Sequence, residues 1–307
     1  MMSIQFVACF HVFLLVTTAT TIPAQHCQVK PEPKVILKGE ELTVNENQFS
    51  KHYSTYPPSL QKKSNGVHLD LEYYVLNKEK NILYVPNFSN ASIAEEIKTF
   101  CVEGQRFTES RIRGSGDASG VEKNDLRTSE SCPLVPAASY LSNPRWQAMT
   151  EQEPMQPQVA KIAREVDVSW FIATRASDLL QVDANTVEAL QVVRYTTPNA
   201  EYKLHHDHGG YYGKHSEHRS WTMLIFLNDV VDAGGHTAFP KLDLEVVPRG
   251  GDALVWSNLV QDGTEVDEDM VHMGQPPSKS GVEKYAVNVW FGVDSFGNRV
   301  KEGQEWT

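Results

Sequence analysis

Short β-rich runs separated by turn residues fill the second half of the chain and constrain its fold more than any other feature. Five such runs follow residue 187, at Ala189–Thr196, Trp221–Leu227, Leu244–Val247, Ala253–Trp256 and Tyr285–Val293. Glycine pairs and a Pro-Asn pair lie between them, where turns are expected. Many short strands with this spacing favour an antiparallel sandwich or jelly roll.

Two amphipathic helices are expected ahead of these strands. Ser92 and Glu95 have the spacing of a capping box, and apolar residues then recur on one helical face up to Gly104. A second helix is expected over residues 157–173, because Pro157 suits a first helical turn and apolar residues follow at helical spacing. Helices followed by antiparallel strands indicate the α+β class.

The charge balance limits the partners of the chain. Its 307 residues suffice for one large domain with extensions, and its formal net charge is −11. An acidic chain lacks the clustered cations that bind a phosphate backbone. We therefore expect no nucleic-acid partner.

Four segments are expected along the chain. Residues 1–24 contain an apolar run that is short for a membrane span and is followed by small residues, which predicts a signal peptide. An uncleaved signal anchor is the alternative, and only then would the chain be attached to a membrane. Either leader predicts the secretory pathway, with the endoplasmic reticulum lumen as the location. A polar extension (25–80), a folded domain (81–295) and a C-terminal tail (296–307) follow.

Three cysteines, Cys27, Cys101 and Cys132, remain outside the leader. In an oxidising compartment an odd number suggests one disulfide and one further thiol. We expect Cys101 to pair with Cys132, and sequence alone leaves the other two pairings open.

A histidine and a carboxylate two residues apart form the first candidate site, at His205 and Asp207. Residues two apart on a strand point to the same side, so these two side chains can reach one metal ion. His272 supplies a third ligand from further along the chain. Two histidines and one carboxylate leave three metal positions open, which is the arrangement of non-haem Fe(II) oxygenases. Taken alone, His205-x-Asp207 could equally belong to a solvated histidine cluster.

Lys284 begins an expected strand in which Ala286, Asn288 and Trp290 share its side of the sheet. A lysine on the inner face of a barrel is costly unless it meets an anion, and the distal carboxylate of 2-oxoglutarate is such an anion. An exposed lysine at a strand start is the alternative. Lys279 is a rival for the anion-binding role, but it lacks the aromatic-x-x-Asn-x-Trp context that follows Lys284.

The order of these motifs resembles that of the prolyl 4-hydroxylase family of Fe(II)/2-oxoglutarate dioxygenases. The match is to the catalytic domain of the α-subunit, and we expect the short single-domain form. The matching segments are Val85-Pro-Asn-Phe, Leu126-Arg-Thr-Ser129, Val193-Arg-Tyr195, Tyr202 to Asp207, Arg219 to Val230, Gly234 to Pro240, Val247 to Leu254 and His272 to Trp290.

The resemblance implies a double-stranded β-helix core, which is a distorted jelly roll, with flanking helices. It implies a 2-oxoglutarate-dependent dioxygenase that uses O2 and holds Fe(II) through His205, Asp207 and His272, with L-ascorbate restoring the iron. The implied co-substrate pocket consists of Lys284, Thr237, Tyr195 and Trp290. Two further residues match positions that face the peptide groove in this family, Arg127 and Arg219.

The resemblance and the leader together predict the substrate. We expect 4-hydroxylation of peptidyl proline in a peptide or protein of the secretory pathway, as a procollagen-proline 4-dioxygenase-like enzyme performs it. The same iron chemistry on lysine, on a free amino acid or on a small molecule is the first alternative. A jelly-roll binding module without turnover is the second, and the complete ligand set counts against it.

Overall fold

The computed structural model describes most of the chain between residues 30 and 293. The described residues are 30–53, 71–110, 112–113, 121–122, 127–196, 200–208, 219–230, 232–260, 263 and 265–293. The expected leader, Cys27 and the expected C-terminal tail lie outside them. Among the helices of the described part, none has the length and apolar character to cross a bilayer.

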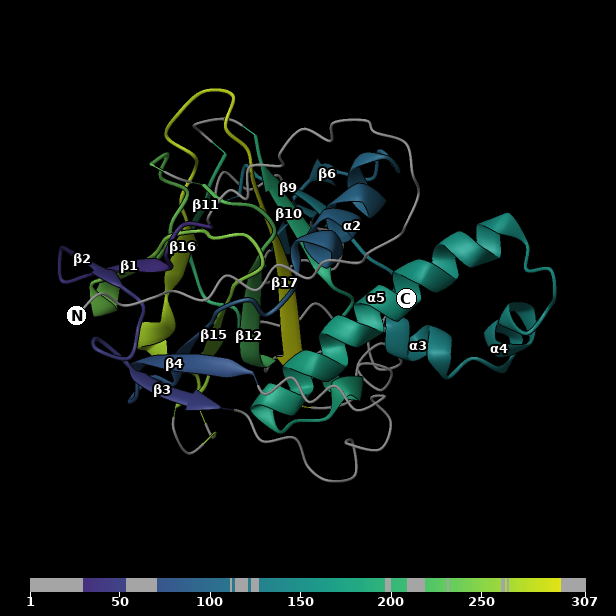
Figure 1. The fold of residues 1–307 in the computed structure, drawn as a ribbon, viewed down its shortest axis with the longest axis horizontal. Coiled ribbons are helices and arrows are strands. Elements are labelled where there is room, and N and C mark those ends of the chain that lie inside the picture. The colour runs from purple at the N-terminus through teal and green to yellow at the C-terminus, as the bar shows by residue number, and fades with distance from the viewer. Residues whose placement is uncertain are drawn as a thin grey trace, which may run out of the picture. The chain divides into compact units, whose positions relative to one another are not determined.

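Two antiparallel sheets dominate the described part of the chain (Figure 1). The smaller sheet contains, in spatial order, β11 (Tyr202–His205), β16 (His272–Gly274), β13 (Thr237–Phe239), β14 (Leu244–Val246), β1 (Lys34–Leu37) and β2 (Glu40–Thr43). The larger sheet contains β3 (Ser50–Tyr53), β4 (Glu72–Asn77), β5 (Ile82–Val85), β15 (Ala253–Ser257), β12 (Arg219–Phe226), β17 (Lys284–Gly292), β10 (Gln191–Tyr195), β9 (Glu130–Pro133) and β6 (Thr108–Glu109). A separate pair joins β7 (Ile112–Arg113) to β8 (Val121–Glu122).

Helices and short helical turns complete the fold. The α-helices are α2 (Ala91–Val102), α3 (Ala137–Leu141), α4 (Pro144–Thr150) and α5 (Pro157–Leu180), and the 3₁₀ turns are η1 (Ala184–Thr186), η2 (Pro240–Leu242) and η3 (Glu268–Met270). The expected helix at residues 157–173 is therefore seven residues longer, since α5 ends only at Leu180. The chain leaves α5 through Gln181, which adopts a left-handed conformation at the C-cap.

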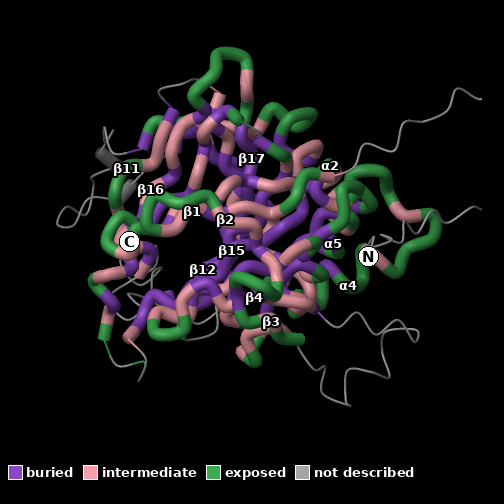
Figure 2. Tube along the Cα trace, turned by 60° about the vertical axis from the view of Figure 1, so that its left-hand side comes forward, coloured by how far each residue is buried: buried purple, intermediate pink, exposed green. Residues whose placement is uncertain are grey.

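Strand β17 shows how the larger sheet divides the core. Every residue of β17 is buried, because both faces of the sheet are covered. Ala286 joins the core that also contains Phe239 and Val246 of the smaller sheet. The alternate residues Val287 and Val289 join a second core on the opposite face. Figure 2 shows β12, β15 and β17 running through this buried interior.

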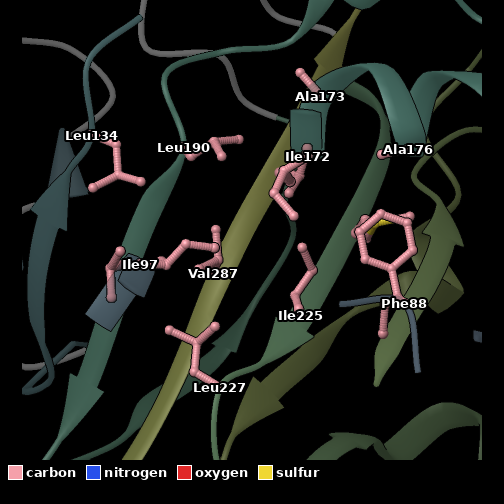
Figure 3. Close-up of a cluster of buried hydrophobic side chains, with 14 of the residues drawn as sticks. Phe88, Ile97, Leu134, Ile172, Ala173, Ala176, Leu190, Ile225, Leu227 and Val287 are labelled. Atoms are coloured by element: carbon pink, nitrogen blue, oxygen red, sulfur yellow. The ribbon is translucent and has the colours of Figure 1, made fainter. Parts of the chain in front are cut away.

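The second core is the packing surface for α2 and α5. Ile97 of α2 and Ile172 of α5 lie beside Ile225 of β12 and Val287 of β17 (Figure 3). Each of these four side chains is fully buried. Burying one such aliphatic side chain contributes roughly 1.5–3 kcal/mol, so the helices are fixed to one face of the sheet. The other face is left for the smaller sheet, and the result is the expected α+β fold with a distorted jelly-roll core.

The disulfide between Cys101 and Cys132 confirms the expected pairing. It joins α2 to β9, and the two Cα atoms are 6.0 Å apart. Both cysteines are fully buried in the second core. The link holds α2 against β9, which lies next to the edge strand β6 of the larger sheet.

The segment expected to be a polar extension contributes strands to both sheets. β1 pairs with β14 in the smaller sheet, and β4 pairs with β5 in the larger one. The described residues of 32–80 therefore belong to the same compact unit as the strands that follow them. The boundary expected after residue 80 does not separate two structural units. The periodicity of this segment is weak because its strands are four to six residues long and lie near sheet edges.

Candidate iron and 2-oxoglutarate site

The three expected metal ligands lie together between the sheets. His205 ends β11 and His272 begins β16, and the antiparallel register pairs them directly. Asp207 lies in a bend two residues beyond the end of β11, and its carboxylate meets the two imidazoles there. One ligand atom from each residue lies within 4.8 Å of the other two. Among the described residues, these three side chains form the one group of three or more His, Cys, Asp or Glu residues that could hold a metal ion.

Backbone carbonyl groups fix the orientation of both imidazoles. Nδ1 of His205 lies 2.7 Å from the carbonyl oxygen of Lys203, and Nδ1 of His272 lies 2.9 Å from that of Met270. A carbonyl only accepts, so Nδ1 must carry the proton in each ring. The lone pair of each Nε2 is thereby left for a metal.

The charge state of the cluster also suits a metal ion. Burial and the neighbouring His272 lower the pKa of His205 to about 4. Burial acts to raise the pKa of Asp207, but the two histidines lower it well below its usual value. At neutral pH the site therefore offers a neutral imidazole and a carboxylate, which are the forms that bind a divalent cation.

Two side chains hold Asp207: Thr222, which sequence reasoning missed, and Trp290, which was expected in the co-substrate pocket and does line this cavity. The Thr222 hydroxyl and the Trp290 indole N–H each donate a hydrogen bond to Oδ2 of Asp207, with a donor–acceptor distance of 3.0 Å in both cases. The amide of Asn258 in turn donates to the Thr222 hydroxyl. Thr222 could have been found from the sequence only by knowing that β12 lies next to β17, where it faces Trp290.

A cavity of about 400 Å³, including its mouth, opens beside the metal ligands. Lys284 projects into it from the start of β17, with 1% of the residue exposed and no hydrogen-bond partner for Nζ. The hydroxyl of Thr237 in the same cavity is also buried and without a partner. A buried ammonium and a buried hydroxyl without partners are costly, so they indicate a missing anion. The distal carboxylate of 2-oxoglutarate fits both.

Burial makes the Lys284 charge sensitive to that anion. It lowers the pKa of the Lys284 ammonium to about 7. Nζ lies 4.8 Å from the centre of the Tyr195 ring, and the two residues are paired across β10 and β17. Lys279, the rival lysine, is exposed on the turn before β17. Lys284 is therefore the lysine that can meet an anion inside this cavity.

The two arginines expected in a peptide groove both pack behind iron ligands. Arg127 lies over the ring of Tyr202, at 4.5 Å, and Tyr202 stacks on His205. Arg219 lies 3.8 Å from the centre of the Trp290 ring. Both arginines are mostly buried, with 8% and 9% of the residue exposed. Their expected contact with a peptide stays a prediction.

Residues 190–292 match the 2OG-Fe(II) oxygenase superfamily. Among curated relatives, the putative prolyl 4-hydroxylase of Acanthamoeba polyphaga mimivirus is 29% identical over 201 residues, which is 63% of this chain and 69% of that protein. The prolyl 4-hydroxylase subunit alpha-1 of Gallus gallus is 34% identical over 125 residues, which is 39% of this chain and 23% of the subunit. The chain thus spans about a quarter of the vertebrate subunit.

Solved structures of similar arrangement include the viral collagen prolyl hydroxylase of Paramecium bursaria Chlorella virus-1 in its 2OG complex. It is 16% identical, with a TM-score of 0.48, and the alignment covers 72% of this chain and 99% of that one. The ligand cluster, the partnerless Lys284 and the superfamily match lead to one assignment. Residues 190–292 form a 2OG-Fe(II) oxygenase domain, and the chain is a 2-oxoglutarate-dependent dioxygenase that resembles prolyl 4-hydroxylases.

Proposed function

We propose that the protein hydroxylates peptidyl proline at C4. The observation that carries the proposal is a complete metal triad in the same cavity as a buried lysine and threonine suited to 2-oxoglutarate. The similarity to proteins described as prolyl 4-hydroxylases supports proline as the target. When bound, Fe(II) would couple oxidative decarboxylation of 2-oxoglutarate by O2 to hydroxylation of the substrate.

The residues of the cavity have separate roles in this proposed reaction. His205, Asp207 and His272 hold the metal, and the carbonyl groups behind the two imidazoles keep each Nε2 directed at it. Lys284 and Thr237 orient the co-substrate by its far end.

We further propose that the reaction takes place in the secretory pathway, in the lumen of the endoplasmic reticulum. Disulfides persist in oxidising compartments and are rare in the cytosol, and the Cys101–Cys132 bond supports such a location. The apolar leader in residues 1–24 points the same way. Detection of the full-length protein in the cytosol, with both cysteines reduced, would overturn this part of the proposal.

A peptide screen tests the substrate. The purified protein is incubated with Fe(II), 2-oxoglutarate, L-ascorbate and proline-rich peptides, and the mass of each peptide is measured by mass spectrometry. We expect a gain of one oxygen on a proline, succinate release that depends on O2, and neither product from an Asp207→Ala variant. Oxygen gain on lysine or on a small molecule, without any on proline, would overturn proline as the target and leave the iron chemistry standing.

A further inference from the structure

The carboxylate of Asp207 has one oxygen that is already saturated. Thr222 and Trp290 both donate to Oδ2, and a carboxylate oxygen has two lone pairs. Oδ1 is the oxygen left for a metal. The two donors lie opposite each other on β12 and β17, so the pairing of these strands sets the direction of Oδ1.

Trp290 is itself clamped by a buried ion pair. The guanidinium of Arg219 lies close against the indole, with its central carbon 3.8 Å from the ring centre. Glu188 then accepts two hydrogen bonds from Arg219, one on each carboxylate oxygen, both at 2.9 Å. The guanidinium can thus neither rotate nor leave the ring without breaking both bonds.

Glu188 also holds the backbone of the same tryptophan. The backbone N–H of Glu188 donates a hydrogen bond to the carbonyl oxygen of Trp290, with a donor–acceptor distance of 2.9 Å. One residue therefore fixes Trp290 at the main chain directly and at the ring through Arg219. The result is a continuous path from Glu188 through Arg219 and Trp290 to Asp207.

Stability alone is a weak explanation for this arrangement. Only 7% of Glu188 and 9% of Arg219 is exposed, so both charges have lost most of their water. Replacing such a buried pair by well-packed apolar side chains is often neutral or stabilising. The pair nevertheless packs against Trp290, which is hydrogen-bonded to the metal ligand Asp207, and groups that orient a ligand typically change metal affinity about 10–100-fold.

We infer that Glu188 and Arg219 are positioning residues that set the metal-binding direction of Asp207 through the Trp290 indole. The inference rests on the iron site of the proposed function and not on its substrate. It also gives Arg219 a task other than contact with a peptide. Metal affinity, and not only turnover, should therefore depend on a glutamate that does not touch the metal.

Cobalt binding in a double-mutant cycle tests the path. Metal-free protein is titrated with Co(II), followed by visible absorption, without 2-oxoglutarate or peptide. We expect Trp290→Phe, which keeps an aromatic ring and removes the N–H, to weaken Co(II) binding about 10–100-fold, and Glu188→Gln to weaken it about tenfold. In the Trp290→Phe background, Glu188→Gln should weaken Co(II) binding by less than a further twofold or so, because the hydrogen bond from Trp290 to Asp207 is already absent. An equal loss in both backgrounds, or no loss in either, would overturn the inference.

Glu165→Gln is the matched control. Glu165 is also a buried glutamate, with 4% exposed, and it pairs with Arg106 at 2.8 Å, but it does not line the cavity. We expect it to lower thermal stability and leave Co(II) affinity unchanged. A similar loss of Co(II) affinity in Glu165→Gln would mean general loosening of the fold, and the positioning role would be wrong.

If Glu188→Gln does not fold, Arg219→Lys takes its place in the double-mutant cycle. A lysine keeps the positive charge but cannot make two parallel bonds to Glu188 or lie flat on the indole. We expect the same loss of Co(II) affinity as for Glu188→Gln, again absent in the Trp290→Phe background. Wild-type affinity in Arg219→Lys would overturn the inference. Because no substrate is present, either result is independent of whether proline is the target.

Discussion

At the scale of single residues, the site is built from side chains whose burial is unfavourable until a ligand arrives. Lys284 and Thr237 have no polar partner inside the protein. Asp207 is held ionised by its histidine neighbours. Each of these features is costly in an empty pocket and becomes favourable when a cation or an anion binds. The placement of individual side chains therefore leads to two predictions about the co-substrate.

The first concerns the pH dependence of 2-oxoglutarate binding. Its distal carboxylate needs the charged form of Lys284, whose pKa in the free pocket is about 7. As pH rises above 7, the protonated fraction of the free enzyme falls about tenfold per unit, so the Kd for 2-oxoglutarate should rise by about the same factor. Calorimetric titration between about pH 7 and pH 9 measures this. Lys284→Arg, which stays charged, should remove the slope, and a slope identical to that of the wild type would contradict the role of Lys284.

The second concerns a glycine that leaves room for Tyr195. A Cβ added at Gly274 would lie 2.6 Å from the Tyr195 hydroxyl oxygen. Gly274→Ala should therefore displace the tyrosine and raise the KM for 2-oxoglutarate, and it should lower the free energy of unfolding by about 1–3 kcal/mol, as overpacking of a core typically does. Steady-state kinetics measure the change. In a Tyr195→Phe background, which removes the clashing oxygen, Gly274→Ala should have little further effect, and an undiminished effect there would rule out the clash.

At the scale of elements, pairing between strands brings the ligands together, and helices hold the sheet that carries Lys284. β11 and β16 place His205 opposite His272, while β10, β12 and β17 form the other wall. Helix α2 supports that wall from behind, through Ile97 and the disulfide at Cys101. The start of α2 differs from the expected capping box. Asn90 is the N-cap, its side chain accepts a hydrogen bond from the N–H of Ile93, and the helix begins one residue before Ser92.

Removing this cap should loosen α2 by a modest amount. Asn90→Ala deletes the acceptor for the Ile93 N–H, and loss of an N-cap typically costs about 1 kcal/mol. Chemical denaturation followed by circular dichroism measures the free energy of unfolding. Asn90→Asp, which retains an acceptor, should stay within a few tenths of a kcal/mol of the wild type. Equal losses in the two variants would show that the cap bond is not the cause.

At the scale of the whole molecule, the jelly roll is closed by segments that lie far apart in the sequence. The first strand pairs with β14, more than two hundred residues later in the chain. The Cys101–Cys132 disulfide crosses a separation of 31 residues. Long-range closures of this kind fix the positions of the cavity walls, and each can be broken separately.

Replacing both bridge cysteines by alanine should lower the free energy of unfolding by about 3–4 kcal/mol, from the loop entropy for a separation of 31 residues. Urea denaturation under non-reducing conditions measures the difference. Reduction of the wild-type disulfide should give a loss of similar size. A change below about 1 kcal/mol in both experiments would contradict this expectation.

A shortened chain that begins at Asn81 should fail to reach the native fold. It lacks β1, which pairs with β14, and β4, which pairs with β5, so each of these two strands would lose one of its two neighbours. We expect it to aggregate or to show no cooperative thermal transition, whereas a chain that begins at Lys30 should unfold cooperatively. Cooperative unfolding of the shorter chain near the wild-type Tm would restore residue 81 as a domain boundary.

Local sequence patterns predicted the elements that carry strong periodicity. The runs around β10, β12, β15 and β17 and the positions of α2 and α5 were visible, because strand and helix periods are local properties. The strands of residues 34–53 were not expected, since short edge strands depend on a partner that only the fold supplies. The ligand triad could be named from spacing and family resemblance, while Thr222 and Glu188 could not.

By itself the sequence determined which groups are available: two imidazoles, a carboxylate, a lysine on an inward strand face and the order in which they occur. Tertiary structure decided what those groups do, because function here depends on which strands become neighbours. Strand register makes Thr222 and Trp290 donors to Asp207, and packing places the Arg219 guanidinium against the Trp290 ring. A side chain's neighbours across a sheet are set by long-range pairing, which no local pattern encodes.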